Sequence, residues 1–483
     1  MTPALLGIDL GTTRVKVGFV APDGTPLGIA RTSYPIDVDP TTGRAEQDQE
    51  AWWSGLVSAI QELTAEQRRD VLGISIAGHG PSLSPVDAAG RPTARAITWL
   101  DSRSTLEAEA LARLTGLRGW SLGVLPAALW LERHDPEAAA RTRWYLNSWE
   151  AMTLRLTGRA AMSLVADQPF PNAEIVAEAG IDPSRIPDEI PAGVPVGRLR
   201  ADVATELGLE AGTRVVAGLV DAFASFHGAG LVEAGDAIDV GGAAGGFGVY
   251  ADRPVEAAGS LCTPAPLPGL FSVGGAMAAT GQALDWFAGD VLGGGLTIEA
   301  LIAEAAAVPA GADGLVFLPY LAGERSPLWD PAARGALAGL TLRHGRAEIT
   351  RAILEAAALA IRHVADPIQR AGVRVSAMRV CGGPAHSEAW NQIKADVTGF
   401  GVKVPRVLET TVVGAAIVAA VGVGVHPDLP AAIRAMTSIE RELEPNPALR
   451  ETYDRLYEAY DALHPAIAPV VARLGRPAAE VSA

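Results

Sequence analysis

The chain opens with a short apolar run that ends in a carboxylate, and an alternating pattern follows it. Leu5 to Leu10 is apolar apart from Gly7 and Asp9, and Gly11-Thr12-Thr13 comes directly afterwards. Alternate positions are then apolar on both sides of a turn at Asp23-Gly24. An Asp-Gly pair between alternating segments is a hairpin signal, so the sequence predicts three antiparallel strands at the start of the chain.

Helical and buried-strand patterns continue along the chain. Residues 46–63 place apolar side chains on one helical stripe, and 348–370 predicts a long amphipathic helix. Val71 to Ala77 is a continuous apolar run, which is typical of a buried parallel strand. Val412 to Val425 is too short to span a bilayer and predicts a buried, close-packing helix. Together these patterns predict a mixed sheet with helices on its faces.

A pattern similar to the opening one recurs later in the chain. Ile8-Asp9-Leu10-Gly11-Thr12-Thr13 compares with Ile238-Asp239-Val240-Gly241-Gly242-Ala243. In each, glycine lets the backbone come close to a ligand, and the following amides can converge on an anion. The repeat suggests an internal duplication in which each half presents a phosphate-approaching hairpin to a shared cleft. An ordinary Asp-Gly hairpin is the alternative for the first stretch taken alone.

Two carboxylates each lie at the end of a predicted apolar strand. Asp9 ends the first strand, and Asp221 follows the run Val215 to Val220. A structural aspartate there has little to bond and is costly to bury unpaired, which favours a functional role for both. Mg2+ usually binds through one or two carboxylates plus substrate phosphates, which suits Asp9. Asp239 is expected to be structural, because its turn lacks hydroxyls.

Composition narrows the class of protein. At 483 residues, two domains are the default expectation, and a net charge of -16 without any basic run argues against nucleic acid and anionic membrane as partners. Cys262 and Cys381 supply neither a disulfide framework nor a CxxC metal site, and no signal peptide pattern is present, so a cytoplasmic protein is expected. None of the three lysines follows a GxxxxG loop, which excludes a Walker-type P-loop. A homodimer is left open.

A paired signature resembles one family closely. Gly335-Ala336-Leu337-Ala338-Gly339-Leu340, seven residues, and then Glu348 to Glu355 match the second signature of the FGGY carbohydrate kinases, relatives of hexokinase, actin and Hsp70. The resemblance runs from Leu5 to about Val425. It implies an α/β fold of two RNase H-like (actin-like ATPase) domains, with mixed sheets flanked by helices, around a deep interdomain cleft. The expected boundaries are 1–232, 233–430 and a helical tail, 431–483.

The resemblance also implies a reaction and its residues. The γ-phosphoryl of MgATP would move to a hydroxyl of a small sugar, with ketopentoses such as xylulose or ribulose as the leading acceptors. Asp9 would help to hold Mg2+, and Asp221 would be the catalytic base and contact the substrate. The substrate-binding positions would be His79, Gly80, Trp99, Asp101 and Arg103. The nucleotide-binding positions would be Gly11, Thr12, Thr13, Gly241, Gly242, Gly281, Gly382, Gly383 and Ser387.

Several positions depart from the family pattern. Gly242-Ala243 stands where threonine and serine are usual, so hydroxyl contacts to phosphate are lost at that turn. Ala127 replaces a usual lysine. The sugar loop reads Gly78-His79-Gly80-Pro81-Ser82, unlike xylulose kinases, and its Gly80-Pro81 disfavours glycerol. A kinase of another sugar or polyol, or a catalytically weakened binding protein on the same fold, therefore remains an alternative.

Other interpretations of single residues stay open. His79 could face solvent or cap a helix, Trp99 could pack in the core, and Asp101 and Arg103 could simply pair with each other. The segment 166–197 reads as an irregular cap. Gly73 to Gly78 approaches the GxSxG motif of acyl hydrolases, but Ser75 lies inside a strand rather than on the turn after it, which argues against that class.

Overall fold

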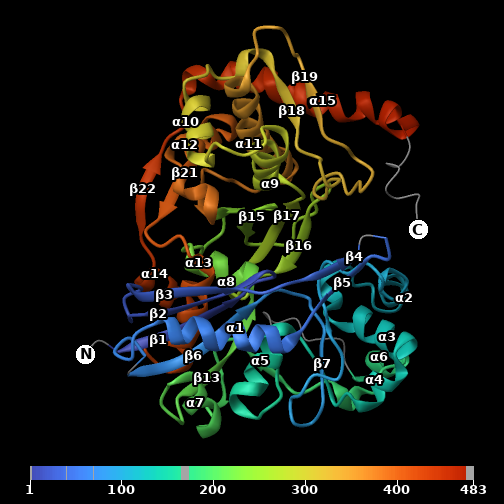
Figure 1. Cartoon of the computed structure of the whole chain (residues 1–483), viewed down its shortest axis with the longest axis vertical. Coiled ribbons are helices and arrows are strands. Elements are labelled where there is room, and N and C mark those ends of the chain that lie inside the picture. The colour runs from blue at the N-terminus through green and yellow to red at the C-terminus, as the bar shows by residue number, and fades with distance from the viewer. Residues whose placement is uncertain (1–2, 40, 69, 165–172, 475–483) are drawn as a thin grey trace. The chain divides into compact units, whose positions relative to one another are not determined.

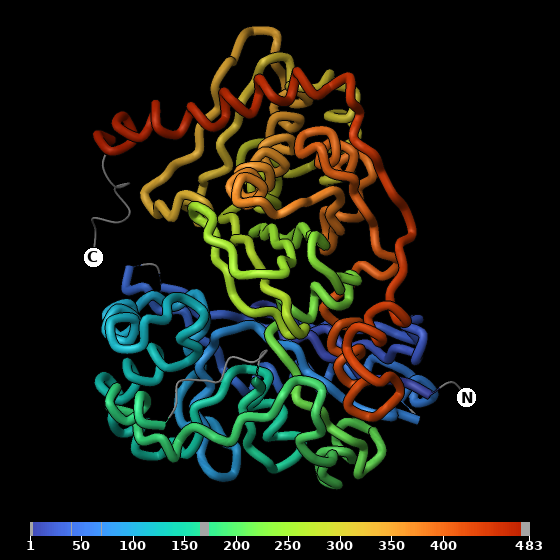
Figure 2. The backbone as a smooth tube through the Cα atoms, turned by 180° about the vertical axis from the view of Figure 1, so that it is seen from behind, coloured from blue at the N-terminus to red at the C-terminus, as the bar shows by residue number. Residues whose placement is uncertain are grey.

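The computed structural model describes residues 3–39, 41–68, 70–164 and 173–474, and the path of the chain is drawn in Figures 1 and 2. Its contacts divide the chain into two compact units. Unit 1 comprises 1–230, 264–268 and 409–437, and unit 2 comprises 231–263, 269–408 and 438–483. Among the described residues, no helix is long and apolar enough to cross a membrane.

Within the described residues, unit 1 is built on a six-stranded sheet. Its spatial order is β12 (Pro195–Arg198), β13 (Arg214–Val220), β6 (Val71–Gly78), β1 (Ala4–Leu10), β2 (Arg14–Val20) and β3 (Pro26–Ser33). The pairs β1/β2 and β2/β3 are antiparallel, which confirms the predicted opening hairpins. Strands β1 and β13 both run parallel to β6. Unit 1 therefore has the predicted mixed sheet.

Helices and short strands surround this sheet. The helices are α1 (Gln49–Glu62), α2 (Thr105–Thr115), α3 (Leu125–His134), α4 (Pro136–Arg141), α5 (Ser148–Thr157), α6 (Ala173–Glu178), α7 (Ala201–Leu207), α8 (Asp221–Gly228), α13 (Thr410–Gly422) and α14 (Leu429–Met436). The short strands are β4 (Asp37–Asp39), β5 (Arg44–Gln47), β7 (Ser84–Val86), β8 (Ala96–Ile97), β9 (Trp144–Leu146), β10 (Met162–Leu164) and β11 (Glu189–Pro191). The predicted irregular segment 166–197 lies partly outside the described residues, and its remainder holds α6, β11 and β12.

The two faces of β1 meet different helices. Leu6 and Ile8 share a hydrophobic core with Trp52 of α1 and with residues of α5 and α7. The opposite face carries Gly7, and a methyl group there would lie 2.1 Å from the carbonyl oxygen of Val412 in α13. A methyl group on Gly18, the partner of Gly7 on β2, would lie 2.4 Å from a side-chain methyl carbon of Val412. The apolar helix α13 is thus buried and closely packed, as the sequence predicts.

A second close approach joins α13 to α8. A methyl group on Gly228 would lie 1.8 Å from the carbonyl oxygen of Thr410, and one on Gly414 would lie 1.8 Å from that of Ala224. Only glycine allows the two backbones to come this near. Since α8 begins at Asp221, this contact fixes that carboxylate relative to α13 and β1.

The compact units divide the chain differently from the expected boundaries 1–232, 233–430 and 431–483. The segment 409–437, orange to red in Figure 2, belongs to unit 1, where α13 packs on β1 and β6. The expected tail is also divided between the units, because α14 lies in unit 1 whereas β22 (Ile439–Leu443) and α15 (Arg450–Leu474) lie in unit 2. Helix α15 buries Tyr453 and Tyr460 in the core of unit 2.

Unit 2 repeats the arrangement of unit 1. Its described seven-stranded sheet has the order β16 (Leu261–Pro264), β17 (Phe271–Met277), β15 (Gly245–Ala251), β14 (Ala237–Gly241), β20 (Ala377–Cys381), β21 (Gly401–Pro405) and β22 (Ile439–Leu443). A small pair, β18 (Val316–Leu318) and β19 (Ala336–Ala338), accompanies it. The helices are α9 (Thr280–Trp286), α10 (Ile298–Ala306), α11 (Arg346–Arg370), α12 (Glu388–Thr398) and α15 (Arg450–Leu474).

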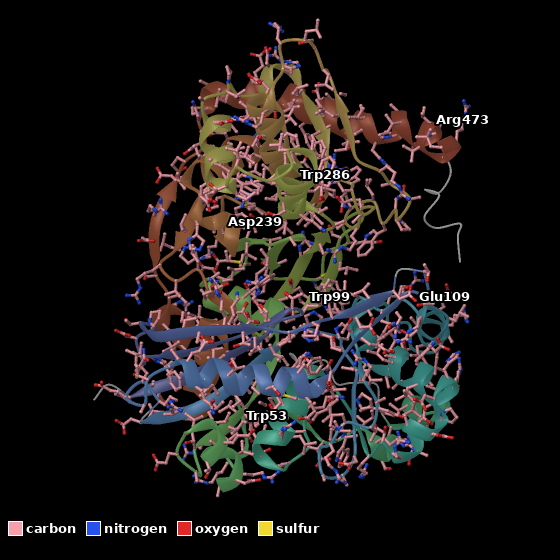
Figure 3. All side chains as sticks on the ribbon, viewed as in Figure 1. Trp53, Trp99, Glu109, Asp239, Trp286 and Arg473 are labelled. Atoms are coloured by element: carbon pink, nitrogen blue, oxygen red, sulfur yellow. The ribbon has the colours of Figure 1, made fainter. Side chains whose placement is uncertain are left out.

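The repeat extends to the aspartates. β14 is antiparallel to β15 and parallel to β20, as β1 is antiparallel to β2 and parallel to β6. Asp239 on β14 forms a buried ion pair with Lys394 of α12, at 2.5 Å between carboxylate and ammonium. Both side chains are almost fully buried, so the pair ties α12 to the central strand (Asp239 is labelled in Figure 3). This contact supports the structural role expected for Asp239.

We predict that Lys394→Met destabilises unit 2 by about 3–5 kcal/mol, because it leaves a buried carboxylate unpaired. Chemical denaturation of the full chain measures the loss, and the double variant Asp239→Val/Lys394→Met should recover part of it. Lys403→Met is the matched control, because Lys403 pairs with Glu442 at 3.8 Å on the surface, and it should cost about 1 kcal/mol or less. Equal losses for the two lysine variants would contradict the role of the buried pair.

Candidate active site

Three parallel strands of unit 1 deliver functional side chains to one edge of the sheet. β1, β6 and β13 are neighbours and run in the same direction. Asp9 lies near the end of β1, His79 directly follows β6, and Asp221 directly follows β13. The carboxyl ends of parallel strands are where α/β proteins bind ligands. The structure therefore brings together the two carboxylates that the sequence singled out.

Asp9 is buried beside one cation and a second carboxylate. Its Oδ2 lies 3.8 Å from Nζ of Lys16, its partner across the β1/β2 hairpin. That ammonium is closer to Glu409, at 2.6 Å, directly before α13. Burial raises the pKa of Asp9 to about 6, with Lys16 opposing the shift and Glu409 adding to it. The carboxylate is thus only partly neutralised by the protein.

Asp221 is the second carboxylate of the site. Its Oδ1 accepts a hydrogen bond from the amide of Ala222 at 2.7 Å. Burial, and then the charge of Asp9, raise the pKa of Asp221 to about 7. A carboxylate that takes up a proton near neutral pH is suited to act as a general base.

Side chains from three segments hold the turn after β1. Tyr34 donates to the carbonyl oxygen of Gly11 at 2.5 Å, and Gln47 donates to that of Thr12 at 2.6 Å. The indole N–H of Trp99 donates to the hydroxyl of Thr12 at 3.0 Å. Burial and the charges of the two site carboxylates raise the pKa of Tyr34, so its hydroxyl keeps its proton. Thr13 is exposed at the tip.

This turn has the features of an anion site. Its carbonyl oxygens are engaged by protein donors, as described above. Among the described residues, the amides of Thr12 and Thr13 donate to no protein acceptor. Backbone amides that lack a protein partner at a tight turn can bind phosphate oxygens. The expected nucleotide contacts of Gly11, Thr12 and Thr13 are chemically feasible here, and their role stays a prediction.

The ring of His79 is buried beside the loop that follows β6. The side chain is 1% exposed, its Nδ1 lies 2.8 Å from Oγ of Ser82, and its ring meets the edge of Trp52. Burial lowers the pKa of His79 to about 3, so the ring is neutral. Nε2 is also buried and has no hydrogen-bond partner among the described residues, so the expected contact of His79 with a sugar hydroxyl stays a prediction. The side chain supports the loop; Gly80 beside it is partly exposed.

Asp101 and Arg103 are engaged with each other. Arg103 binds Asp101 at 2.7 Å and Glu46 at 2.6 Å, and it lies over the ring of Trp130. The Asp101 side chain is 1% exposed and also accepts from the amide of Ala45. This arrangement matches the alternative in which the two residues pair with each other. Their expected substrate contacts stay a prediction.

In unit 2, two glycines from separate segments approach the second turn. Gly241 ends β14, and Gly242 and Ala243 form the exposed tip. A methyl group on Gly281 would lie 2.2 Å from the carbonyl oxygen of Gly242, and one on Gly382 would lie 1.9 Å from that of Gly241. The amide of Gln282 donates to the carbonyl oxygen of Ala243 at 2.9 Å. The structure thus brings together four of the predicted nucleotide positions within unit 2.

The remaining predicted positions follow β20. Gly383 has open space where a side chain would stand. The hydroxyl of Ser387 accepts from the amide of Trp390 at 3.2 Å and caps α12. Their contact with adenosine stays a prediction.

The donor set fits a hard divalent cation at Asp9. The described residues contain no group of three or more histidines, cysteines or carboxylates that could hold a metal alone. Mg2+ does not need one, because it binds through one or two carboxylates and completes its shell with water and phosphate. Asp9, with the charge of Asp221 close by, offers such a partial set.

Sequence reasoning missed four residues at this edge: Lys16, Tyr34, Gln47 and Glu409. The position of Lys16 could have been predicted, because a four-residue turn after Leu10 places it opposite Asp9. The other three come from separate segments, and no local pattern marks them.

Comparisons with known proteins agree with this geometry. The FGGY family of carbohydrate kinases matches with its N-terminal domain over residues 4–228 and its C-terminal domain over 240–423. A xylulose kinase of Escherichia coli (strain K12) is 33% identical over 422 residues, which cover 82% of this chain and 84% of that protein.

Solved structures give the same result. The xylulose kinase of Rhodospirillum rubrum has a TM-score of 0.82 at 31% identity and covers 97% of this chain and 99% of its own. A gluconate kinase of Lactobacillus acidophilus has a TM-score of 0.87 at 22% identity, covering 98% and 100%, and shows the fold alone. The predicted two-domain, actin-like α/β fold is confirmed. The chain therefore belongs to the FGGY family of carbohydrate kinases and is an ATP-dependent sugar kinase.

Proposed function

We propose that this kinase phosphorylates a ketopentose, with xylulose as the first choice and MgATP as the donor. The main support for xylulose as the acceptor is the 33% identity to a protein named xylulose kinase over 82% of this chain. The solved xylulose kinase at 31% identity supports it. The likeness to a gluconate kinase concerns the fold and adds nothing about the acceptor.

Asp221 is proposed as the catalytic base. A sugar hydroxyl is a poor nucleophile, and its proton must leave as the bond to phosphorus forms. The carboxylate of Asp221, with a pKa raised to about 7, accepts that proton. The hydroxyl oxygen attacks the γ-phosphorus, and the bond from that phosphorus to the bridging oxygen of ADP breaks.

Asp9 is proposed to hold Mg2+. When bound, the cation neutralises charge on the phosphates. The amides of Thr12 and Thr13 would bind phosphate oxygens at the first turn. In unit 2, the turn at Gly241-Gly242 would bind phosphate through its amides alone, and the loop of Gly382, Gly383 and Ser387 would contact adenosine.

The acceptor site favours a neutral sugar over a sugar acid. Arg103 is the cation of the Trp-x-Asp-x-Arg segment, and its guanidinium is already paired with Asp101 and Glu46. A sugar carboxylate would have to break these pairs to gain a partner. A ketopentose carries no charge and needs only hydrogen bonds and the ring of Trp99.

Of the predictions for this proposed function, the first concerns the acceptor. With MgATP and a panel of D-xylulose, D-ribulose, L-xylulose, gluconate and glycerol, a coupled ADP assay should give the highest kcat/KM for a ketopentose. Gluconate and glycerol should be at least about tenfold poorer, because binding sites discriminate strongly when charge or hydroxyl contacts are missing. A preference for gluconate would refute the choice of acceptor. ATP binding without ADP release on any acceptor would favour a weakened binding protein.

The second prediction concerns the base. Asp221→Asn keeps the size of the side chain but cannot take a proton, so kcat should fall by about two to four orders of magnitude. The affinity for MgATP, measured by calorimetry, should stay within about threefold. Glu206→Gln, on α7 of the same unit, is the control and should leave kcat unchanged. An unaltered kcat for Asp221→Asn would remove this residue from the mechanism.

The third prediction concerns pH. Asp221 is active only when deprotonated, and its pKa is raised to about 7. Because kcat/KM for MgATP reports the free enzyme, it should rise about tenfold per pH unit below about pH 7 and level off above it. A flat profile between about pH 5 and about pH 8 would show that no such base limits the reaction.

A further inference from the structure

Trp99 connects the acceptor loop of unit 1 to its phosphate turn. Its indole N–H donates to the Thr12 hydroxyl at 3.0 Å, and its backbone N–H donates to Oγ of Ser82 at 3.1 Å. Ser82 lies 2.8 Å from Nδ1 of His79, and both of these side chains are buried. Trp99 (labelled in Figure 3) is therefore fixed at its backbone by a buried pair while its ring reaches the turn.

This bond constrains the proton of Thr12. An indole N–H is a donor only, so the Thr12 oxygen must accept from it, and the threonine's own O–H is left to donate elsewhere. The carbonyl oxygen of Thr12 is held separately by Gln47, at 2.6 Å. Thr12 is thus anchored at two atoms from two segments, and its hydroxyl cannot turn freely.

The neighbouring threonine lacks such an anchor. Thr13 is exposed, and within the described part of the chain no side chain binds its hydroxyl. The second turn, Gly242-Ala243, carries no hydroxyl at all. Thr12 therefore supplies the one hydroxyl on these two turns that a neighbouring side chain orients in advance.

We propose that Trp99 is a positioning residue for phosphoryl transfer: its indole N–H orients the Thr12 hydroxyl so that this hydroxyl donates to the transferred phosphoryl group. The inference rests on the proposed function and adds a role for the tryptophan that is separate from contact with the sugar. A donor aimed in advance at developing charge needs no reorganisation when the reaction occurs.

Trp99→Phe tests the bond directly, because it keeps an aromatic face for the sugar and removes only the N–H and part of the ring. We expect kcat to fall about 3- to 10-fold, as for the loss of one hydrogen bond, with the acceptor KM within about twofold. Trp53→Phe is the matched control. Trp53 donates to Glu206 at 2.9 Å in the same unit, and its loss should leave kcat unchanged.

A double-mutant cycle separates orientation from simple packing. Thr12→Val should lower kcat about 100-fold or more, as for the loss of one transition-state donor. Adding Trp99→Phe to Thr12→Val should then change kcat by less than about twofold, because the hydroxyl to be oriented is gone. In Thr12→Ser the hydroxyl returns, and Trp99→Phe should again cost its full 3- to 10-fold. Equal effects of Trp99→Phe in all three backgrounds would overturn the proposal.

Measuring nucleotide affinity separates the role of Trp99 from the proposed function, because it does not require turnover of an acceptor. The affinity for a non-hydrolysable ATP analogue with Mg2+ is measured by calorimetry for the same variants, with thermal unfolding to confirm folding. Thr12→Val and Trp99→Phe should each weaken the affinity, and the double variant should be no weaker than Thr12→Val alone. If wild type turns over none of the acceptors, the proposed function fails, and this binding cycle alone decides the role of Trp99. Additive losses of affinity would then refute it.

Discussion

The close approach of α13 to the central sheet is the constraint on which the active site of unit 1 depends. Gly7 lets the backbone of α13 lie directly on β1, and the pairing of Gly228 with Gly414 lets α8 lie directly on α13. Asp9 lies on the same face of β1 as Gly7, because side chains two apart share a face. One helix thereby fixes both carboxylates and also brings Glu409 to Lys16. A methyl group at any of these glycines would separate elements that carry the chemistry.

The internal repeat shows how one position can serve two purposes. Asp9 and Asp239 occupy equivalent places on β1 and β14, beside equivalent hairpins. Asp239 has Lys394 at 2.5 Å and is neutralised inside the domain. Asp9 has its lysine at 3.8 Å, and that lysine is bound more closely to Glu409. The same carboxylate is therefore structural in one half and chemically available in the other, and the placement of one lysine makes the difference.

The sequence predicted the parts that local patterns encode. The opening hairpins, the buried helix and the two aspartates at strand ends follow from periodicity and from the cost of burying charge. Two partners of the turn after β1, Tyr34 and Gln47, and the partner of Lys16, Glu409, could not be predicted, because they come from separate segments. The burial of His79 could not be predicted from the sequence either, because it depends on Trp52 of α1 packing against the loop. Lys16 is the exception, because the register of the predicted hairpin already places it opposite Asp9.

If Asp9 holds Mg2+ and Asp221 is the base, as proposed, the charges of the two carboxylates couple metal binding to the pKa of the base. The charge of Asp9 helps to raise the pKa of Asp221, and the charge of Glu409 helps to raise that of Asp9. Lys16 offsets part of this repulsion, but it is shared between two carboxylates. A divalent cation at Asp9 would remove the repulsion that Asp221 feels and lower its pKa. The base would then be deprotonated most readily when the donor complex is in place, which couples proton removal to the presence of MgATP.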